Sequence, residues 1–461
     1  MSQARVNTAP AGGGLDPAER TGLARRAAVA SVVGTAVEWY DYFIFGTASA
    51  LVFGRLFFPS DGDPIIGTLS AFAVFGVGFF FRPLGGIVFG HLGDRLGRKK
   101  TLVVTLMTMG IATFLIGCLP TAESIGILAP ILLVVLRLVQ GLGVGGEWGG
   151  ATLVAVEFAP PGKRGVYGAF PQVGNAIGLV AATGIWALMA MLPDDQLDAW
   201  GWRVPFLLSI VLIVVGMVIR MKLTETPAFL EAQRQAEARQ AAGEKTRLPL
   251  ADVFRRSWRR LLLTMGMRLG EGVAGYVVLT LVLSYSETYT DIPRADAILF
   301  TTVAALFGIV TFWVLGRLSD RIGRRWVFVI GAGVSVLMAY PVFAALGSGS
   351  ILLSFVVVIV AYAVGVGGMY AVESSFFAEL FPTSSRYTGL SLAAQIPSMV
   401  VGVWPFAATA MLAATGGDPL PVVLVVVGCS LLALVCALIA PETKDADIEQ
   451  DDVPARKAAT R

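Results

Sequence analysis

Charged side chains occur in the middle of long apolar stretches of this sequence. Glu38 and Asp41 lie three residues apart in one stretch, and Arg268 and Glu271 repeat that spacing in another. Residues three apart lie on one face of a helix. A charge in hydrocarbon costs at least about 2.5 kcal/mol, so each such residue needs a partner or a function. These two pairs are therefore the first candidates for chemistry.

The composition requires a membrane around these stretches. Of 461 residues, 56% are hydrophobic and 15% charged, and the mean hydropathy is +0.74. No water-soluble domain can bury that much apolar surface. Twelve runs are long enough to span a bilayer at about 20 residues each: 27–54, 65–89, 101–119, 127–156, 166–192, 204–221, 260–288, 297–316, 326–347, 350–378, 388–414 and 419–440. We predict an all-α, multi-pass protein of the cytoplasmic membrane.

The distribution of Lys and Arg predicts the orientation. Positive residues beside a span resist translocation. Only Arg55, Arg203 and Arg294 fall in the odd-numbered connections, whereas the even-numbered connections and both tails carry most of the others. Both termini are therefore expected inside the cell. Because the basic residues are scattered through short loops, we expect no nucleic-acid partner.

The chain divides in two at one long polar connection. We predict a surface helix there, because it is rich in Ala, Gln, Glu and Arg. The expected organisation is a disordered cytosolic tail (1–26), an N-terminal six-helix bundle (27–221), a cytosolic linker (222–259), a C-terminal six-helix bundle (260–440) and a cytosolic tail (441–461).

The two halves repeat each other. The segment Gly90-His-Leu-Gly-Asp94-Arg95-Leu-Gly97-Arg98-Lys99 recurs as Gly316-Arg-Leu-Ser-Asp320-Arg321-Ile-Gly323-Arg324-Arg325, and Glu157 and Arg164 recur as Glu379 and Arg386. The repeat predicts two parallel bundles with a binding cavity at their interface.

This repeated segment resembles the signature of the major facilitator superfamily, G-x-x-x-D-R-x-G-R-R/K. The resemblance implies a charge latch between spans that helps to set the inward/outward equilibrium. Asp94 is expected to cap a helix N-terminus or to pair with Arg95 or Arg98. We predict gating roles for Gly90, Asp94, Arg95, Gly97, Arg98, Asp320, Arg321, Arg324, Glu157, Arg164, Glu379 and Arg386. Arg82 is interpreted either as snorkelling or as capping this latch, and His91 as solvated.

A narrower resemblance covers nearly the whole chain. Glu38-Trp-Tyr-Asp41-Tyr-Phe, Phe81-Arg82-Pro83-Leu-Gly-Gly86, Arg137-Leu-Val-Gln140-Gly-Leu-Gly-Val-Gly-Gly146-Glu147-Trp148-Gly149-Gly150 and Gly201-Trp202-Arg203-Val-Pro205-Phe206 are similar to the metabolite:proton symporters. That family includes shikimate, α-ketoglutarate, citrate and proline/betaine transporters. The Gly67-Thr-Leu-Ser-Ala-Phe stretch and Gly110-Ile-Ala-Thr-Phe-Leu-Ile-Gly117 most resemble the shikimate branch.

If the fold is as this resemblance implies, the buried charges share one central chamber. A carboxylate there can change its protonation state when the site switches sides. Arginine stays charged and offers a planar fork to a substrate carboxylate. We predict proton coupling at Asp41, Glu38, Glu147 and Glu271, and substrate binding at Arg137 and Arg268, with Glu373 lining the same chamber. The alternative for Arg268 and Glu271 is that they merely neutralise each other.

Uncharged residues complete the predicted site. We expect Gln140 and Asn175 to hydrogen-bond substrate hydroxyls, and Trp39, Tyr40 and Tyr276 to flank its carbon skeleton. Helix packing is the alternative for each of them. No metal site is expected, because the chain has three cysteines and one histidine without ligand spacing. Protons are the only expected coupling species, and no cofactor is expected.

These features together predict a transporter that imports a small carboxylated metabolite with protons and works as a monomer. No nucleotide-binding or hydrolase motif occurs in the context that it needs, so we do not expect an enzyme. Three alternatives remain open: a proton symporter for a zwitterionic osmolyte such as proline or betaine, a drug/proton antiporter, and a ligand sensor that does not transport.

Overall fold

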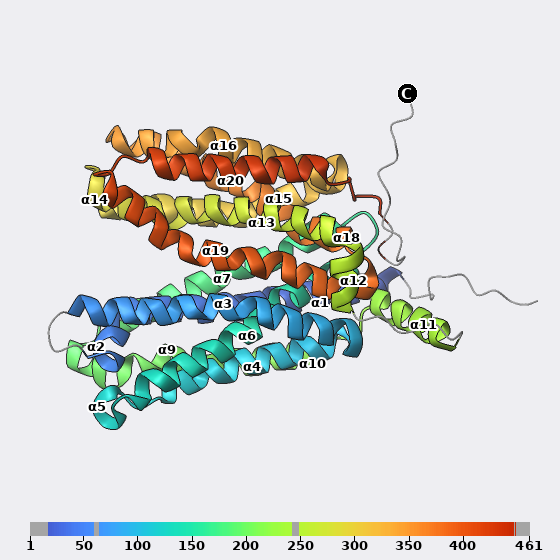
Figure 1. Cartoon of the computed structure of the whole chain (residues 1–461), viewed down its shortest axis with the longest axis horizontal. Coiled ribbons are helices and arrows are strands. Elements are labelled where there is room, and N and C mark those ends of the chain that lie inside the picture. Colours follow the sequence, from blue (N-terminus) through green and yellow to red (C-terminus); the bar gives the residue numbers. More distant parts are fainter. Residues whose placement is uncertain (1–16, 60–63, 242–248, 447, 449–461) are drawn as a thin grey trace, which may run out of the picture.

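The computed structural model describes residues 17–59, 64–241, 249–446 and 448, and every regular element in those residues is helical (Figure 1). The N-terminal half consists of α1 (Pro17–Ala48), η1 (Ser49–Phe53), α2 (Gly54–Phe57), α3 (Pro64–Leu96), α4 (Arg98–Cys118), α5 (Ala122–Ile125), α6 (Leu128–Glu157), α7 (Arg164–Met189), α8 (Asp194–Gln196), η2 (Leu197–Gly201), α9 (Arg203–Leu207) and α10 (Ser209–Met221).

Two short helices lead to the second half. They are α11 (Pro227–Ala241) and α12 (Pro249–Arg256). The C-terminal half consists of α13 (Trp258–Tyr276), η3 (Val277–Leu281), α14 (Val282–Tyr289), α15 (Arg294–Ile322), α16 (Arg324–Gly347), α17 (Ile351–Val360), η4 (Ala361–Val366), α18 (Gly367–Leu380), η5 (Thr383–Ser385), α19 (Arg386–Ala414) and α20 (Leu420–Ile439). Figure 1 shows the halves one above the other, with their long helices aligned.

Eleven of the predicted spans have a helix of sufficient length and apolarity among the described residues. The predicted span that is not among the eleven is the first one, which corresponds to α1 with η1 and α2 and packs against α7 in the N-terminal half. Large apolar side chains point outward along the bundle, as in Leu352, which is 73% exposed. That surface suits lipid rather than water.

Two predicted boundaries are wrong. Residues 17–26 are helical, not a tail, because α1 continues beyond its apolar part; residues 1–16 lie outside the described residues. Residues 90–96 are the last turns of α3, and only Gly97 separates α3 from α4. Gly97 and its repeat counterpart Gly323 have φ of 109° and 107°, a conformation that favours glycine.

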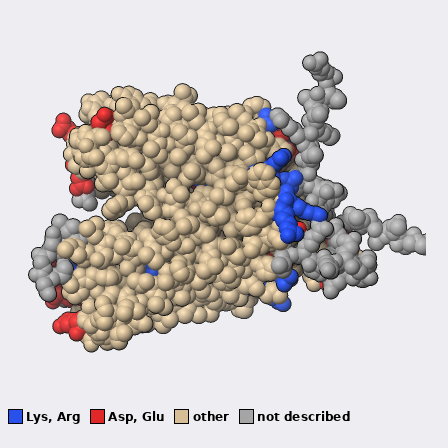
Figure 2. All heavy atoms as spheres, viewed as in Figure 1, with Lys and Arg blue, Asp and Glu red and all other residues tan. Residues whose placement is uncertain are grey.

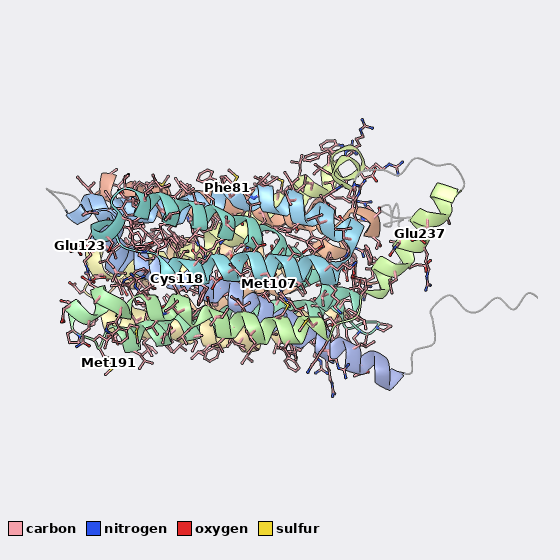
Figure 3. The ribbon with its side chains drawn as sticks, turned by 90° about the horizontal axis from the view of Figure 1, so that it is seen from below. Phe81, Met107, Cys118, Glu123, Met191 and Glu237 are labelled. Carbon is pink, nitrogen blue, oxygen red and sulfur yellow. The ribbon has the colours of Figure 1, made fainter. Side chains whose placement is uncertain are left out.

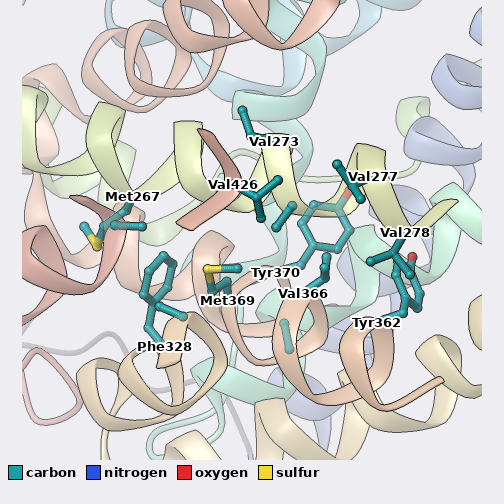
Figure 4. Packing of buried hydrophobic residues seen from close by; sticks show 14 of the residues in the cluster. Met267, Val273, Val277, Val278, Phe328, Tyr362, Val366, Met369, Tyr370 and Val426 are labelled. Carbon is teal, nitrogen blue, oxygen red and sulfur yellow. The ribbon is translucent and has the colours of Figure 1, made fainter. Parts of the chain in front are cut away.

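Each half has its own apolar core. In the N-terminal half, aromatic rings dominate, with Phe53 packed between Phe45, Trp202 and Phe206. In the C-terminal half, Figure 4 shows Tyr370 lying between Val277 and Val366. The aromatic packing fixes α1 against α9, and the second core fixes α18 against η3. The helices that carry the buried charges are therefore held rigidly within each half.

The halves meet along α3 with α19 and along α7 with α15. Lys and Arg gather at the end of the molecule near α11 and α12, whereas Asp and Glu lie at the opposite end (Figure 2). Figure 3 shows the same axis, with Glu237 of α11 at one end and Glu123 and Met191 at the other. Figure 2 also shows a hollow between the halves at the acidic end.

Candidate functional site

The C-terminal half holds its arginine between two carboxylates. Arg268 of α13 donates from Nη1 to Glu271 Oε2 and to Glu373 Oε2 of α18, both at 2.8 Å. Trp148 of the N-terminal half lies 5.6 Å from the Arg268 guanidinium, so this cluster reaches the interface between the halves. The structure brings together three residues that the sequence assigned to one chamber. With both carboxylates ionised, the cluster has one negative charge in excess.

The N-terminal half links a carboxylate to an arginine without an ion pair. Arg137 Nη1 donates to Gln140 Oε1 (3.1 Å), Gln140 Nε2 to Thr113 Oγ1 (2.6 Å), and Thr113 Oγ1 to Asp41 Oδ2 (2.7 Å). Asp41 is 2% exposed and its Oδ1 has no hydrogen-bond partner in the described residues. Asp41 and Arg137 are thus joined through a hydroxyl and an amide by three consecutive hydrogen bonds.

Two further N–H groups of Arg137 donate within its own half. Nε and Nη2 donate to the Phe75 carbonyl oxygen at 3.4 and 3.3 Å. The guanidinium also lies 4.3 Å from the centre of the Phe45 ring and 4.8 Å from that of Phe75. These contacts hold the Arg137 guanidinium in position while two of its five N–H groups have no hydrogen-bond partner among the described residues.

Glu38 and Arg82 face each other without bonding. Glu38 is 6% exposed, its Oε2 has no partner, and no hydrogen bond of Glu38 occurs in the described residues. Among charged groups, Arg82 interacts most strongly with Glu38, but they form no ion pair within 4 Å. Arg82 lies over the rings of Phe79 (4.3 Å) and Tyr42 (5.8 Å). It makes no contact with the latch, contrary to one of the two interpretations of Arg82.

Aromatic residues surround these charges. Trp39 packs edge-to-face on Tyr42 (5.2 Å between ring centres), and both are partly exposed, as is Tyr276 of α13. At the interface, Asn175 Nδ2 of α7 donates weakly to the Tyr370 hydroxyl (3.4 Å). Trp39, Tyr276 and Asn175 are partly exposed, and their contact with a substrate stays a prediction.

Two predicted site residues lie inside the N-terminal bundle instead. Glu147 is fully buried, forms an ion pair with Arg220 of α10 and accepts a hydrogen bond from Thr105 Oγ1 (2.8 Å). Tyr40 is buried and donates to the Pro205 carbonyl oxygen (2.7 Å). Both have complete structural partners, so neither faces a ligand in this conformation.

The basic end is closed by two equivalent latches. In the first, Asp94 of α3 accepts from Tyr387 N (3.1 Å), Thr388 N (2.9 Å) and Thr388 Oγ1 (2.8 Å) at the start of α19, and also from Arg98 Nη1 (2.7 Å). A carboxylate is favoured there, because free N–H groups and the positive end of the helix dipole point at it. Asp94 of one half therefore caps a helix of the other.

The second latch repeats this geometry in the opposite direction. Asp320 of α15 accepts from Gly165 N (2.8 Å) and Val166 N (3.1 Å) at the start of α7, and from Arg324 Nη1 (2.8 Å). The internal repeat of the sequence thus places two crossed caps at one interface.

Buried glutamates tie each latch to the neighbouring helices. Glu157 contacts Arg386 of the other half (3.1 Å) and accepts from Thr226 Oγ1 (2.6 Å). Glu379 contacts Arg164 of the other half (3.2 Å) and accepts from Thr443 Oγ1 (2.6 Å). The chain after α20 also crosses this end, since Arg164 Nη2 donates to the Ala446 carbonyl and Arg386 Nη2 to that of Ile448.

Three residues near the latches differ from expectation. The side chains of Arg95 and Arg321 are exposed and form no ion pair in the part of the chain that the structure describes. The pairing of Asp94 is with Arg98, because Arg95 is one residue along and points to another side of the helix. His91 lies in α3 rather than in a turn, and it is partly exposed with a buried Nδ1 that has no hydrogen-bond partner among the described residues.

The sequence analysis missed Thr113 and Arg220 and did not place Arg82 in the site. Nothing local marks Thr113, because a threonine in an apolar helix more often bonds its own backbone. Arg220 stands at the end of a span and reads as a positive-inside residue. Arg82 had a usable signal, since it is as deep in its apolar run as Arg137.

Comparison with known families accounts for this arrangement. A family model described as "Sugar (and other) transporter" matches residues 27–453. The chain belongs to this transporter family. Its major facilitator resemblance is confirmed, and it is a multi-pass transporter of the cytoplasmic membrane rather than an enzyme.

Individual relatives of this transporter family cover most of the chain. The shikimate transporter of Escherichia coli (strain K12) is 40% identical over 451 residues, which is 97% of this chain and 100% of that protein. The proline/betaine transporter of the same strain is 35% identical over 389 residues, 83% of this chain and 77% of that protein. The solved structure of the proton:xylose symporter XylE bound to 6-bromo-6-deoxy-D-glucose has a TM-score of 0.74 at 16% identity, over 94% of this chain and 98% of that one. This last similarity shows a shared fold.

Proposed function

We propose that this chain is a proton-coupled symporter that imports a small carboxylated metabolite, such as shikimate or a dicarboxylic or keto acid, by alternating access. In this proposal α1 also crosses the membrane and brings the number of spans to twelve. Both termini are cytosolic, and the monomer is the functional unit. The positive-inside rule supports the orientation, since Lys and Arg gather at the end that carries α11 and α12. The hollow then opens to the outside, and the latches close the inside.

The observation that carries the proposal is the relay from Asp41 through Thr113 and Gln140 to Arg137. A buried carboxylate without an ion-pair partner is costly when ionised, and it gains from binding a proton. Protonation removes the charge that the Thr113 hydroxyl stabilises, so the relay and Arg137 rearrange. A proton and an anion are thereby coupled through three hydrogen bonds.

The transport cycle follows from these contacts. In the outward-facing state, a proton binds Asp41 and the substrate anion binds arginine in the hollow. A proton and a monoanion together add no net charge to the interface, so the halves can close over the ligand without burying an extra charge while the latches break. Arg268 contacts the substrate once Glu271 or Glu373 gives up its bond. Release of both ligands inside restores the buried charges, and the empty carrier returns.

The relative at 35% identity favours one alternative, a proton symporter for proline or betaine. Proline also carries a carboxylate, so the same arginines suit it. Its cationic ammonium needs the excess negative charge of Arg268, Glu271 and Glu373, or an aromatic face such as Trp39. The two functions can therefore be distinguished by whether uptake requires a cationic group on the ligand.

The test is uptake by the purified protein in liposomes with an acid exterior. Labelled shikimate, α-ketoglutarate, citrate and proline are followed in parallel, each with and without a protonophore. Accumulation of an acid that the protonophore abolishes supports the proposal. Accumulation of proline alone favours the alternative. Downhill flux that no pH gradient drives would reject proton coupling.

A further inference from the structure

The three arginines near the interface differ in how many partners they already have. Arg268 bonds two carboxylates, and Arg137 bonds a carbonyl and an amide. Arg82 of α3 has no hydrogen bond and no ion pair among the described residues. A guanidinium has five donors and is favourable in a protein interior when they are used. Arg82 is therefore the only one of the three with none of its five donors in use among the described residues.

The surroundings of Arg82 restrict what binds it. Its guanidinium stands 4.3 Å from the centre of the Phe79 ring and 5.8 Å from that of Tyr42, and the residue is partly exposed. These two aromatic rings hold the Arg82 guanidinium in position. The N–H groups along the edge of the guanidinium then remain for a planar hydrogen-bond acceptor. Carboxylate matches that fork with two parallel hydrogen bonds.

The charges around Arg82 act on an anion in opposite directions, since Arg268 attracts it and an ionised Glu38 repels it. Glu38 of α1 is the carboxylate with the strongest interaction, and Tyr42 and Arg268 are the other groups that act on it. No ion pair joins Arg82 to Glu38, and Glu38 Oε2 is unpartnered as well. Arg268 adds positive charge from the other half.

The backbone of α3 places Arg82 at the interface of the halves. Pro83 follows it directly, and α3 packs on α19 of the C-terminal half. Movement of α3 against α19, which alternating access requires, therefore displaces Arg82 relative to Arg268. A ligand held by Arg82 senses that movement directly.

We propose that Arg82 is the residue that recognises the substrate carboxylate in the outward-facing state and so sets the preference for acids. This inference rests on the proposed function and deepens it. The ligand class is a small carboxylate with a ring or flat carbon skeleton, which Phe79 and Tyr42 flank.

Counterflow exchange in proteoliposomes tests the inference without relying on proton coupling. Shikimate, α-ketoglutarate, citrate and proline are the probes, and the methyl ester of each exchanged acid other than proline, with every carboxyl group esterified, serves as an uncharged competitor. The variants are Arg82→Gln, Arg82→Lys and the matched control Arg317→Gln. Arg317 of α15 is exposed and also lies over an aromatic ring, that of Trp313 (5.7 Å).

We expect Arg82→Gln to raise the KM for the acid at least about tenfold, as loss of a charged hydrogen bond typically does, with Vmax kept within about twofold. Preference for the acid over its ester should disappear. Arg82→Lys should fall between, because it keeps the charge but not the fork. Arg317→Gln should match the wild type.

The two proposals fail in different ways. If the wild type exchanges none of the four probes, the proposed function fails and the inference fails with it. If the wild type exchanges an acid and Arg82→Gln keeps both its KM and its preference over the ester, only the inference is overturned. If Arg82→Gln does not fold, a wild-type KM in Arg82→Lys together with an unchanged ester preference overturns it.

Discussion

Helices α1 and α13 begin the two halves and carry charged residues at matching positions, but their surroundings differ. In α1, Glu38 and Asp41 are buried with no ion-pair partner in the described residues, and Asp41 relies on a hydroxyl. In α13, Arg268 and Glu271 form an ion pair that Glu373 extends. A carboxylate held only by a hydroxyl is far easier to protonate than one held by arginine. From this difference we propose that the N-terminal half carries proton coupling and the C-terminal half a charge clamp.

Replacing Asp41 should have the largest effect. Asp41→Asn keeps the shape and the hydrogen bond from Thr113 but cannot gain or lose a proton. We expect pH-driven accumulation to fall to the level of protein-free liposomes, while counterflow exchange continues within about threefold of wild type, since exchange needs no net proton movement. Both are measured in the same proteoliposome preparation. Equal loss of accumulation and exchange would contradict a proton role.

The clamp should respond differently to the same chemical change. Glu373→Gln leaves Arg268 paired with Glu271 and removes the excess negative charge, so we expect proton-driven accumulation to persist within about tenfold. Arg268→Gln leaves two facing carboxylates and should be more damaging, because an uncompensated buried charge typically costs about 3–5 kcal/mol. Uptake and thermal unfolding in detergent check both variants. If Glu373→Gln behaves like Asp41→Asn, the assignment of coupling to one half is wrong.

The relay itself offers a finer test of the N-terminal half. Thr113→Val removes the hydroxyl between Gln140 and Asp41 while preserving shape, and Thr113→Ser retains it. An unsatisfied buried polar group costs about 1–3 kcal/mol, so accumulation should drop roughly tenfold in the valine variant. The serine variant should recover most of it. Initial uptake rates against external pH provide the measurement, and equal rates in both variants would show that the relay does not couple the two residues.

The sequence predicted the architecture well, because its signals are additive. Long apolar runs and repeated glycines give helices and turns regardless of tertiary contacts, and one boundary error arose where α1 continues past its apolar part. The repeat allowed us to predict that Asp94 and Asp320 act as equivalent caps. It did not show which helix each aspartate caps.

The candidate site was predicted only in part. Where tertiary packing brings two interacting side chains together, the sequence around each of them carries no pattern that identifies the other. Arg268, Glu271 and Glu373 could be grouped by their depth in apolar runs. The pairing of Glu147 with Arg220 could not, because the two residues lie far apart in the chain and are brought together by the packing of α6 and α10. Thr113 was invisible for the same reason: its function depends on the neighbours that α4 meets.

The two latches predict that the functional difference between the halves does not extend to the basic end. Asp94→Asn and Asp320→Asn each remove the charge from one crossed cap, and both should weaken closure of the basic end by about 1–2 kcal/mol. Because the two caps mirror each other, we expect the shift toward the inward-facing state to be alike within about threefold, unlike the outcomes for Asp41 and Glu373. Distance distributions between spin labels on α11 and α15 in variants free of native cysteine report the shift. A much larger shift for one aspartate would mean that the functional difference between the halves extends from the chamber to the gate, and that the halves do not move as equivalent units.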